Sequence, residues 1–135
     1  MSYLLDTHVW LWMLTAPDRL GVAATQIMSD STSRLLLSAA STWEIAIKYA
    51  AGRLNLPQPP GDYLLEWMRR SNVQGLAISH THALAVASLR PHHRDPFDRM
   101  IAAQAKVESV PLITADRVFA AYDVELIAAG EATPA

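Results

Sequence analysis

Short apolar runs recur along the chain, and polar or turn-forming residues separate each run from the next. Runs of about four to eight apolar residues between turn signals are typical of buried strands. The clearest runs predict strands at 2–5, 34–38, 75–78, 110–114 and 124–127. Helical spacing and helix-start signals fill the intervals. They predict helices that begin at Thr7 and after Asp95, and helices over 22–29, 45–51, 63–70, 80–89 and 117–122.

Strands and helices alternate from one end of the chain to the other. This order is typical of an α/β domain, in which a mostly parallel sheet has helices on both faces. A length of 135 residues suits one domain with a proper core. We therefore expect a single domain over 1–128 and a flexible C-terminal tail over 129–135.

Two of the predicted helices carry start signals that involve acidic residues. Asp95 followed by Pro96 is a typical start, because the aspartate accepts a hydrogen bond from a free backbone N–H and the proline already has a helical φ. Asp98 then falls in the first turn of that helix. Ser41 and Glu44 have the spacing of a capping box, so we expect a helix to open at these residues.

Further helix ends are marked by single residues. Ser79 is expected to cap the helix over 80–89. Gly52 is expected at the C-terminal end of the helix over 45–51, because glycine adopts the left-handed conformation that ends many helices. The proline-rich segment 56–61 is expected to be a loop.

Composition limits the classes of function. The chain has no cysteine, which excludes disulfides, thiolate zinc sites and cysteine nucleophiles. The longest strictly apolar run, 9–14, is too short to cross a bilayer, and no basic segment precedes it, so we expect a cytoplasmic protein without membrane contact. A net charge of −2 means that nucleic acid could bind only through local basic patches.

Four acidic residues are expected at one edge of the sheet. Parallel α/β sheets bind their ligands at the carboxyl ends of the strands. Asp6 ends the first predicted strand, and Glu44 lies just after the second. Asp98 opens the helix before the fourth predicted strand, and Asp116 follows that strand. All four therefore map to the carboxyl edge.

Each acid also has a purely structural interpretation. Asp6 and Asp116 are suitable helix N-caps, Asp98 suits the positive end of a helix dipole, and Glu44 could pair with Lys48 four residues on. Capping does not explain four carboxylates in one place, because two of them about 5 Å apart repel by roughly 3 kcal/mol at an effective dielectric constant near 20. Such a group requires raised pKa values or a cation, and an all-oxygen site suits Mg²⁺ or Mn²⁺.

Other polar and aromatic residues have weaker claims to a role. Thr114 could orient a carboxylate, or be an ordinary β-branched strand residue.

Arg99 could contact phosphate together with the loop residues His92, His93 and Arg94, or pair structurally with a nearby acid. His80 and His82 face apart on a helix and make a poor metal pair. We expect the four tryptophans to be core or interface residues: Trp10, Trp12, Trp43 and Trp67.

The residues around the acids resemble the PIN-domain nucleases, and most of all the VapC toxins of bacterial toxin–antitoxin pairs. The similar segments are Leu4-Leu5-Asp6-Thr7-His8, Trp43-Glu44-Ile45-Ala46-Ile47-Lys48, Asp95-Pro96-Phe97-Asp98-Arg99, Ile113-Thr114-Ala115-Asp116 and Gly52-Arg53-Leu54-Asn55-Leu56-Pro57. The resemblance covers nearly the whole chain. His8 departs from the wider family, in which asparagine is frequent at this position.

The resemblance implies a PIN-like three-layer sandwich whose central sheet has the strand order 3-2-1-4-5. It implies a Mg²⁺-dependent endoribonuclease that also accepts Mn²⁺. Asp6 and Asp98 would be the main metal ligands, with Asp116 and Glu44 completing the site directly or through water. A water activated by the metal would cleave RNA. The family further implies a homodimer that is neutralised by a cognate VapB-like antitoxin.

Two other functions stay open at this stage. A non-catalytic PIN-like module would bind RNA or protein without cleaving it, but such a module has no need of four mutually repelling acids. A metal-dependent phosphohydrolase for small substrates would keep the acids and act on a nucleotide or another phosphoester.

Overall fold

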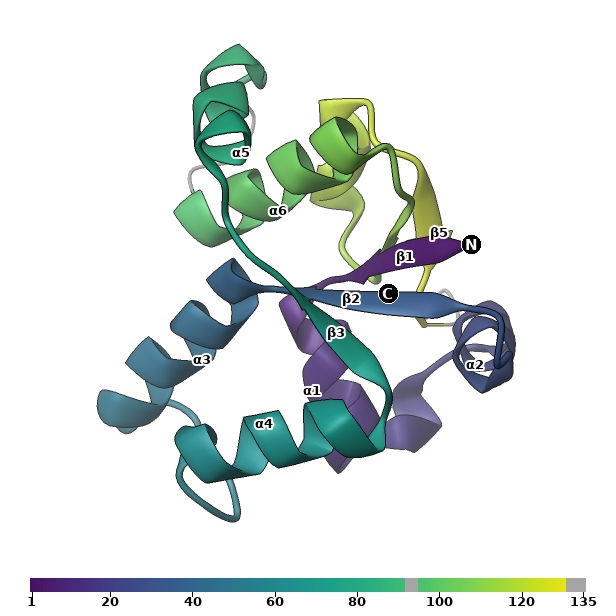
Figure 1. The fold of residues 1–135 in the computed structure, drawn as a ribbon, viewed down its shortest axis with the longest axis vertical. Coiled ribbons are helices and arrows are strands. Elements are labelled where there is room, and N and C mark those ends of the chain that lie inside the picture. Colours follow the sequence, from purple (N-terminus) through teal and green to yellow (C-terminus); the bar gives the residue numbers. More distant parts are fainter. Residues whose placement is uncertain (92–94, 131–135) are drawn as a thin grey trace.

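A five-stranded parallel sheet forms the centre of the computed structural model, which describes residues 1–91 and 95–130 (Figure 1). The strand order is β3-β2-β1-β4-β5, and every pair of neighbours is parallel. This confirms the expected α/β class and the order implied by the resemblance. The strands are β1 (Ser2–Leu5), β2 (Arg34–Ser38), β3 (Val73–Leu76), β4 (Leu112–Thr114) and β5 (Leu126–Ala128).

The register of the central strands divides their side chains between two cores. Leu4 pairs with Leu36 and with Leu112, and these three side chains belong to one core. Their neighbours in sequence belong to the other core, because successive side chains of a strand point to opposite faces of the sheet. Both faces are covered, which explains why the strands are apolar at successive positions.

The first core lies under the face of the sheet that carries Leu5 and Leu37. The helices on this side of the sheet lie in the lower half of Figure 1. They are α1 (Thr7–Thr15), α2 (Val22–Ser29) and α4 (Pro60–Arg70), with α3 (Ala39–Ala50) at the side. The fully buried Trp10 of α1 is the largest side chain of this core, as expected for a core tryptophan.

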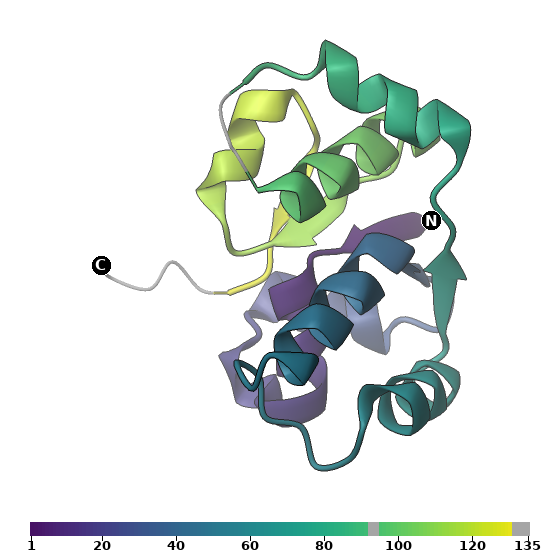
Figure 2. The same cartoon turned by 90° about the vertical axis from the view of Figure 1, so that its left-hand side faces the viewer.

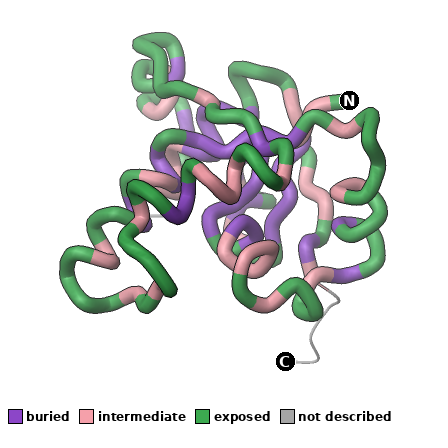
Figure 3. Tube along the Cα trace, turned by 60° about the horizontal axis from the view of Figure 1, so that its bottom comes forward, coloured by how far each residue is buried: buried purple, intermediate pink, exposed green. Residues whose placement is uncertain are grey.

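The second core lies against the opposite face, below α6 (Pro96–Glu108) and α5 (His80–Ala85) (Figures 1 and 2). Helix α6 presents the small buried residues Ala102, Ala103 and Ala105, which let it pack closely on the strands. The structure is therefore a three-layer sandwich. Figure 3 shows that burial is concentrated in the strands and the inner helix faces.

Helix α3 begins earlier than the capping-box interpretation predicted. Ser38 ends β2 and is the N-cap of α3, where its side chain accepts a 2.9 Å hydrogen bond from the N–H of Ala40. Ser41 lies inside the helix and is fully buried. Its hydroxyl accepts a 2.8 Å hydrogen bond from Thr7 Oγ1 instead of capping, so the predicted start was wrong.

Glycine ends α3 as predicted. Gly52 has a φ of 72°, and its N–H donates to the carbonyl of Tyr49. The N–H of Arg53 donates to the carbonyl of Lys48, which completes a Schellman motif. The proline-rich loop that follows is shorter than expected, because Pro60 takes the first position of α4.

Several boundaries differ from the predictions: β4 begins at Leu112 rather than 110, β5 at Leu126 rather than 124, and α5 ends at Ala85, where a 3-10 turn over Val86–Ser88 replaces the predicted helix to 89. Strand β3 begins at Val73 rather than 75 and ends at Leu76 rather than 78, because Leu76 pairs with Ser38, the last residue of β2. At the C-terminus, Ala128 still pairs in β5 and Ala129 is fully buried, with its N–H bonded to the carbonyl of Thr114. Residues 131–135 of the expected tail lie outside the described residues. No helix in the described part of the chain has the length and apolar character that crossing a membrane requires.

Candidate active site

Asp6 and Thr114 meet where two neighbouring strands end. Asp6 directly follows β1, and Thr114 is the last residue of β4, which pairs with β1. Asp6 is at the N-cap position of α1, but its side chain makes no capping bond. Instead, its Oδ2 accepts a 2.8 Å hydrogen bond from Thr114 Oγ1. The threonine therefore orients a carboxylate, which is the first of the two interpretations offered for it.

Burial makes the charge of Asp6 costly. Asp6 is only 4% exposed, and desolvation is the largest influence on its carboxyl group, raising its pKa above the ordinary value. The hydrogen bond from Thr114 and interactions with His8 and Thr7 oppose the increase, whereas the nearby charge of Asp116 raises the pKa further. A cation at this position would relieve both the desolvation and the repulsion.

Asp116 lies two residues beyond the end of β4, and its side chain is exposed. Its N–H donates a 3.0 Å hydrogen bond to Thr114 Oγ1, so the threonine hydroxyl links the two acids. Its Oδ1 accepts a 3.0 Å hydrogen bond from the N–H of Val118 and caps the 3-10 helix Arg117–Tyr122. The capping interpretation of Asp116 is thus confirmed. Asp116 also lies close enough to Asp6 for its charge to raise the pKa of Asp6.

Asp98 occupies the first turn of α6, as the sequence predicted. Asp95 Oδ1 accepts hydrogen bonds of 2.8 Å from the N–H of Phe97 and of 3.3 Å from the N–H of Asp98, and Pro96 takes the first helical position. The Asp98 side chain is half-buried. The cap therefore fixes the backbone from which this carboxylate projects.

Glu44 is almost fully buried in the second turn of α3, at 4% exposure. Its Oε2 forms a 2.7 Å ion pair with Lys48 Nζ, which confirms the predicted pairing four residues on. Its Oε1 is also buried and has no hydrogen-bond partner within the described residues. An unpaired buried carboxylate oxygen is costly, and a bound cation or an ordered water is the usual explanation.

Two contacts tie the helices that carry these acids together. The hydrogen bond between Thr7 and Ser41 joins the start of α1 to the first turn of α3, within a turn of Glu44. The rings of Trp43 and Phe97 meet edge to face with their centroids 5.1 Å apart, which joins α3 to the start of α6. Asp6, Glu44 and Asp98 consequently lie on or next to helix ends and turns that contact one another beyond the carboxyl ends of β1 and β2.

The donor set suits a hard divalent cation, but the carboxylates are not preassembled around a single point. All four candidates offer oxygen, the ligand type preferred by Mg²⁺ and Mn²⁺. Across residues 1–91 and 95–130, no three acidic or histidine side chains form a group that could hold a metal ion. The buried oxygen of Glu44 and the desolvated Asp6 nevertheless fit a cation better than they fit an apolar core.

Arg99 makes several contacts within the protein, and its contact with phosphate stays a prediction. Its guanidinium donates to the carbonyls of Arg90, at 3.0 Å, and Val86, at 3.2 Å, and lies 6.0 Å from the ring centroid of Tyr122. These contacts hold the connection before α6 against the helix. His92, His93 and Arg94, predicted to contact phosphate with Arg99, lie outside the described residues.

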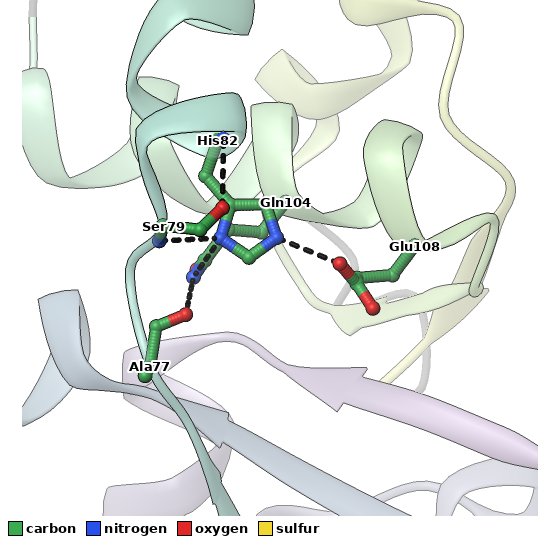
Figure 4. Close-up of polar contacts among 5 residues, drawn as sticks. All are labelled: Ala77, Ser79, His82, Gln104 and Glu108. Carbon is green, nitrogen blue, oxygen red and sulfur yellow. Dashed lines mark hydrogen bonds and ion pairs between the residues drawn. The ribbon is translucent and has the colours of Figure 1, made fainter.

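A polar cluster around His82 was not predicted from the sequence (Figure 4). Ser79 caps α5 as predicted, and the ring of His82 completes a capping box, because Nδ1 accepts a 3.0 Å hydrogen bond from the N–H of Ser79. On its other side, His82 Nε2 lies 2.7 Å from Glu108 Oε2. Gln104 bonds the carbonyl of Ala77 beneath the ring. The cluster joins α5 to the C-terminal half of α6, away from the four acids.

Comparisons with known proteins point to one family. The family model described as PIN domain matches residues 3–125. Ribonuclease VapC22 of Mycobacterium tuberculosis is 33% identical over 116 residues, which are 86% of this chain and 88% of that protein. Ribonuclease VapC16 of the same organism is 45% identical over 56 residues, which span 42% of this chain but only 40% of that protein.

Solved structures share the fold. VapBC2 from Rickettsia felis, crystallised with a DNA fragment from its promoter, contains a chain that superposes with a TM-score of 0.72. The superposition covers 94% of this chain and 98% of that chain, at 17% sequence identity. At this identity the likeness establishes the fold alone.

Proposed function

This chain belongs to the PIN-domain family, and from that membership we propose that it is a metal-dependent endoribonuclease that acts as the toxin of a VapBC-type pair. The relatives VapC16 and VapC22 are ribonucleases by name, which supports RNA as the substrate. The hydroxyl bridge from Thr114 to Asp6 and Asp116 is the observation that carries the proposal. Keeping the buried Asp6 beside the charge of Asp116 lowers the stability of the fold. A helix cap alone does not require two acids at this position.

In the proposed mechanism, Asp6 and Asp98 are the main ligands of a Mg²⁺ or Mn²⁺ ion, and Asp116 and Glu44 complete the site directly or through water. When bound, such an ion supplies an activated water and stabilises negative charge on the phosphoryl group. Thr114 fixes the orientation of Asp6 by donating to one of its oxygens. The cap by Asp95 fixes the turn that carries Asp98.

Lys48 has a distinct role in this proposal. Its ammonium holds Glu44 Oε2 in the described structure and leaves Oε1 unpaired. Lys48 is 42% exposed, so its ammonium can turn towards solvent without burying a charge. We expect Lys48 to balance the charge of Glu44 until the ion binds, after which the glutamate would face the other carboxylates.

The partners of the proposed toxin follow from its structural neighbours. VapBC2 from Rickettsia felis is a complex of the two components of such a pair, which supports a cognate VapB-like antitoxin for this chain. A homodimer is the expected assembly, because the half-buried apolar side chains of α1 (Leu11, Trp12, Met13 and Leu14) suit a subunit or antitoxin contact. A cytoplasmic location stays a prediction.

The alternative function, a non-catalytic PIN-like binding module, has one observation in its favour. The Glu44–Lys48 pair neutralises one of the four acids, and the carboxylates are not gathered as a group that could hold an ion. A binding module would tolerate this pairing. It would not need the desolvated Asp6, and for this reason the nuclease is the better-supported function.

Cleavage of RNA by the purified chain, free of any copurified partner, tests the proposal. We would incubate it with a mixed RNA pool in Mg²⁺ and in EDTA, beside Asp98→Asn and the control Asp123→Asn. Asp123 is exposed and precedes β5, at the opposite edge of the sheet, and asparagine tolerates its left-handed φ of 57°. Cleavage is expected in Mg²⁺ for the wild type and the control, and to be lost in EDTA and in Asp98→Asn.

The outcomes separate the candidate functions. Equal cleavage by Asp98→Asn and the wild type would overturn the proposed mechanism. RNA binding without cleavage, together with no Mn²⁺ binding in calorimetry, would favour the binding module. Turnover of small phosphoesters without RNA cleavage would indicate a phosphohydrolase. Circular dichroism of each variant controls for folding.

A further inference from the structure

Trp43 is an exposed tryptophan beside the candidate active site. Its side chain is 60% exposed, whereas Trp10 is fully buried and Trp12 and Trp67 are half-buried. Of the two roles expected for the tryptophans, Trp43 therefore does not have the core role, and an interface role stays a prediction. A large exposed apolar side chain costs free energy in water, so its presence next to acidic residues suggests a bound partner.

The contact with Phe97 holds the indole without covering it. The two rings are inclined by 77° with centroids 5.1 Å apart, which is an edge-to-face arrangement. In such a pair only one ring presents a face to its neighbour. Whichever ring presents its edge, Phe97 leaves at least one face of the Trp43 indole uncovered. The indole is thus anchored and still has a flat surface to offer.

The position of the indole follows from the residues next to it. Trp43 directly precedes Glu44 on α3, and Phe97 directly precedes Asp98 on α6. The aromatic pair therefore spans the two helices that carry two of the four acids. A base stacked on Trp43 would lie on the solvent side of these helices, and Trp43 and the buried Glu44 leave α3 in different directions from adjacent positions.

We infer that Trp43 stacks on one unpaired nucleobase of the RNA substrate, next to the cleaved phosphodiester. The inference rests on the proposed ribonuclease function and names a residue that selects single-stranded RNA. Unpaired bases stack on aromatic side chains, and each such stack contributes appreciably to binding whatever the base. A base in a duplex is already stacked on both sides and could not use the indole.

A protein partner explains the exposure less well than RNA does. Ile47, at 45% exposure one turn along α3, is the neighbour that extends the apolar surface of Trp43. Other large exposed apolar residues among those described lie on different elements, for example Leu65 on α4 and Leu84 on α5. A stable protein interface buries about 800 Å² per partner, more than two side chains supply. A single base needs only one aromatic face.

Fluorescence titration with a single-stranded oligoribonucleotide tests the inference. The parent protein would be the full chain with Asp98→Asn, which prevents cleavage, and it would be compared with the same protein carrying Trp43→Phe, Trp43→Ala or Ile47→Ala. Stacking is expected to quench the parent's tryptophan emission, and Trp43→Phe is expected to remove most of that quenching while keeping most of the affinity. Trp43→Ala is expected to weaken binding about 5- to 100-fold, the loss typical of one base–aromatic stack, and Ile47→Ala less than twofold.

Abasic substitutions in the oligoribonucleotide locate the stacked base. When one base at a time is removed, binding to the parent should weaken markedly at one position. Removing the base at that position should not weaken binding to Trp43→Ala, whereas the other positions should behave as in the parent. Equal affinities of the parent and Trp43→Ala, or identical abasic profiles, would overturn the inference. A third outcome would also overturn the inference. If Trp43→Ala changed the mass of the protein in light scattering but left its RNA affinity unchanged, a second copy of the chain would be what covers the indole.

Failure of this inference is distinguishable from failure of the proposed function. If stacking is wrong but the nuclease is right, the wild type and Trp43→Ala cleave RNA in Mg²⁺ with the same efficiency. If the nuclease is wrong, the wild type cleaves no RNA in Mg²⁺. A parent that binds no single-stranded RNA at all would overturn the stacking inference directly.

Discussion

Thr114 Oγ1 donates a 2.8 Å hydrogen bond to Asp6 Oδ2 and accepts a 3.0 Å hydrogen bond from the N–H of Asp116. Replacing Thr114 with valine keeps its shape and removes both bonds. Because Asp6 is buried, we expect the free energy of unfolding to fall by about 1–3 kcal/mol. We also expect Mn²⁺ affinity to fall, because Asp6 would lose the group that orients it. Urea denaturation and calorimetry would measure the two effects.

The control for this prediction is Thr114→Ser, which keeps the hydroxyl. We expect it to retain most of the Mn²⁺ affinity, with a small loss of stability from the missing methyl group. If Thr114→Val and Thr114→Ser were equally impaired in Mn²⁺ binding, the methyl group rather than the hydrogen bond would be the important feature of this residue.

Asp6→Asn is expected to stabilise the metal-free protein at neutral pH. Burial raises the pKa of Asp6 in the folded chain, so between the ordinary aspartate pKa and the raised value the native state binds more protons than the unfolded state. Stability therefore decreases as the pH rises through this window, and the penalty persists above it. Asparagine does not titrate and avoids the penalty. Thermal unfolding of both proteins between acidic and neutral pH would reveal the divergence.

Mn²⁺ should reverse the order of the two proteins in that experiment. The wild type should gain stability when the ion is added, because binding to the native state alone shifts the unfolding equilibrium. Asp6→Asn should gain little. A wild-type chain that is more stable than Asp6→Asn at neutral pH without metal would show that the buried charge is already compensated by other groups.

The sheet could be predicted from local pattern because its strands are covered on both faces. Residues such as Leu35, Leu36 and Leu37 must then all be apolar, and a short apolar run between polar segments is visible without any knowledge of distant contacts. The order of the strands has no such local signal. It came from the resemblance, which carries information about the whole chain.

Helix starts depended on contacts that the sequence does not display. Ser38 and Ser41 are both suitable N-caps, and the choice between them is made by Thr7, whose hydroxyl bonds to Ser41 from the start of another helix. Asp95 was unambiguous because Pro96 can follow a cap but disfavours most other positions in a helix.

The positions of the four acids followed from the rule for parallel sheets, but their environments did not. Nothing local indicates that Asp6 is buried while Asp116 is exposed, since both lie within two residues of the end of an apolar strand. The partner of His82 was equally hidden, because Glu108 lies on a different helix. The sequence held a partial signal for the contact between His82 and Ser79, because their spacing is that of a capping box.

Glu44 and Lys48 should respond to mutation in opposite ways. Lys48→Met removes the cation from a carboxylate that is 5% exposed. Since Lys48 itself is partly solvated, we expect a loss of about 1 kcal/mol of stability, with Mn²⁺ affinity kept or increased because the ammonium no longer competes. Glu44→Gln removes the buried charge and should change stability little, while weakening Mn²⁺ binding. Calorimetry and urea denaturation of both variants would measure this.

The predicted contrast depends on Glu44 facing the ion. Should Lys48→Met weaken Mn²⁺ binding as much as Glu44→Gln does, the pair would be acting as one structural unit and Glu44 would not be a ligand. Lys48→Arg is the conservative control, because it retains a cation four residues from Glu44.

His82→Ala should destabilise the fold without affecting metal binding. The ring is 3% exposed and joins Ser79 to Glu108, so its removal leaves the N–H of Ser79 without its ring partner and creates a cavity. We expect a loss of about 2–4 kcal/mol in urea denaturation.

Glu108→Gln should cost less, about 1 kcal/mol, because the amide oxygen still accepts from Nε2. Glu108 lies about 15 Å along α6 from Asp98, as expected for ten helical residues, so Mn²⁺ affinity should be unchanged in both variants. A drop in Mn²⁺ affinity comparable to that of Asp98→Asn would instead mean that the His82 cluster sets the position of α6 at the acidic edge.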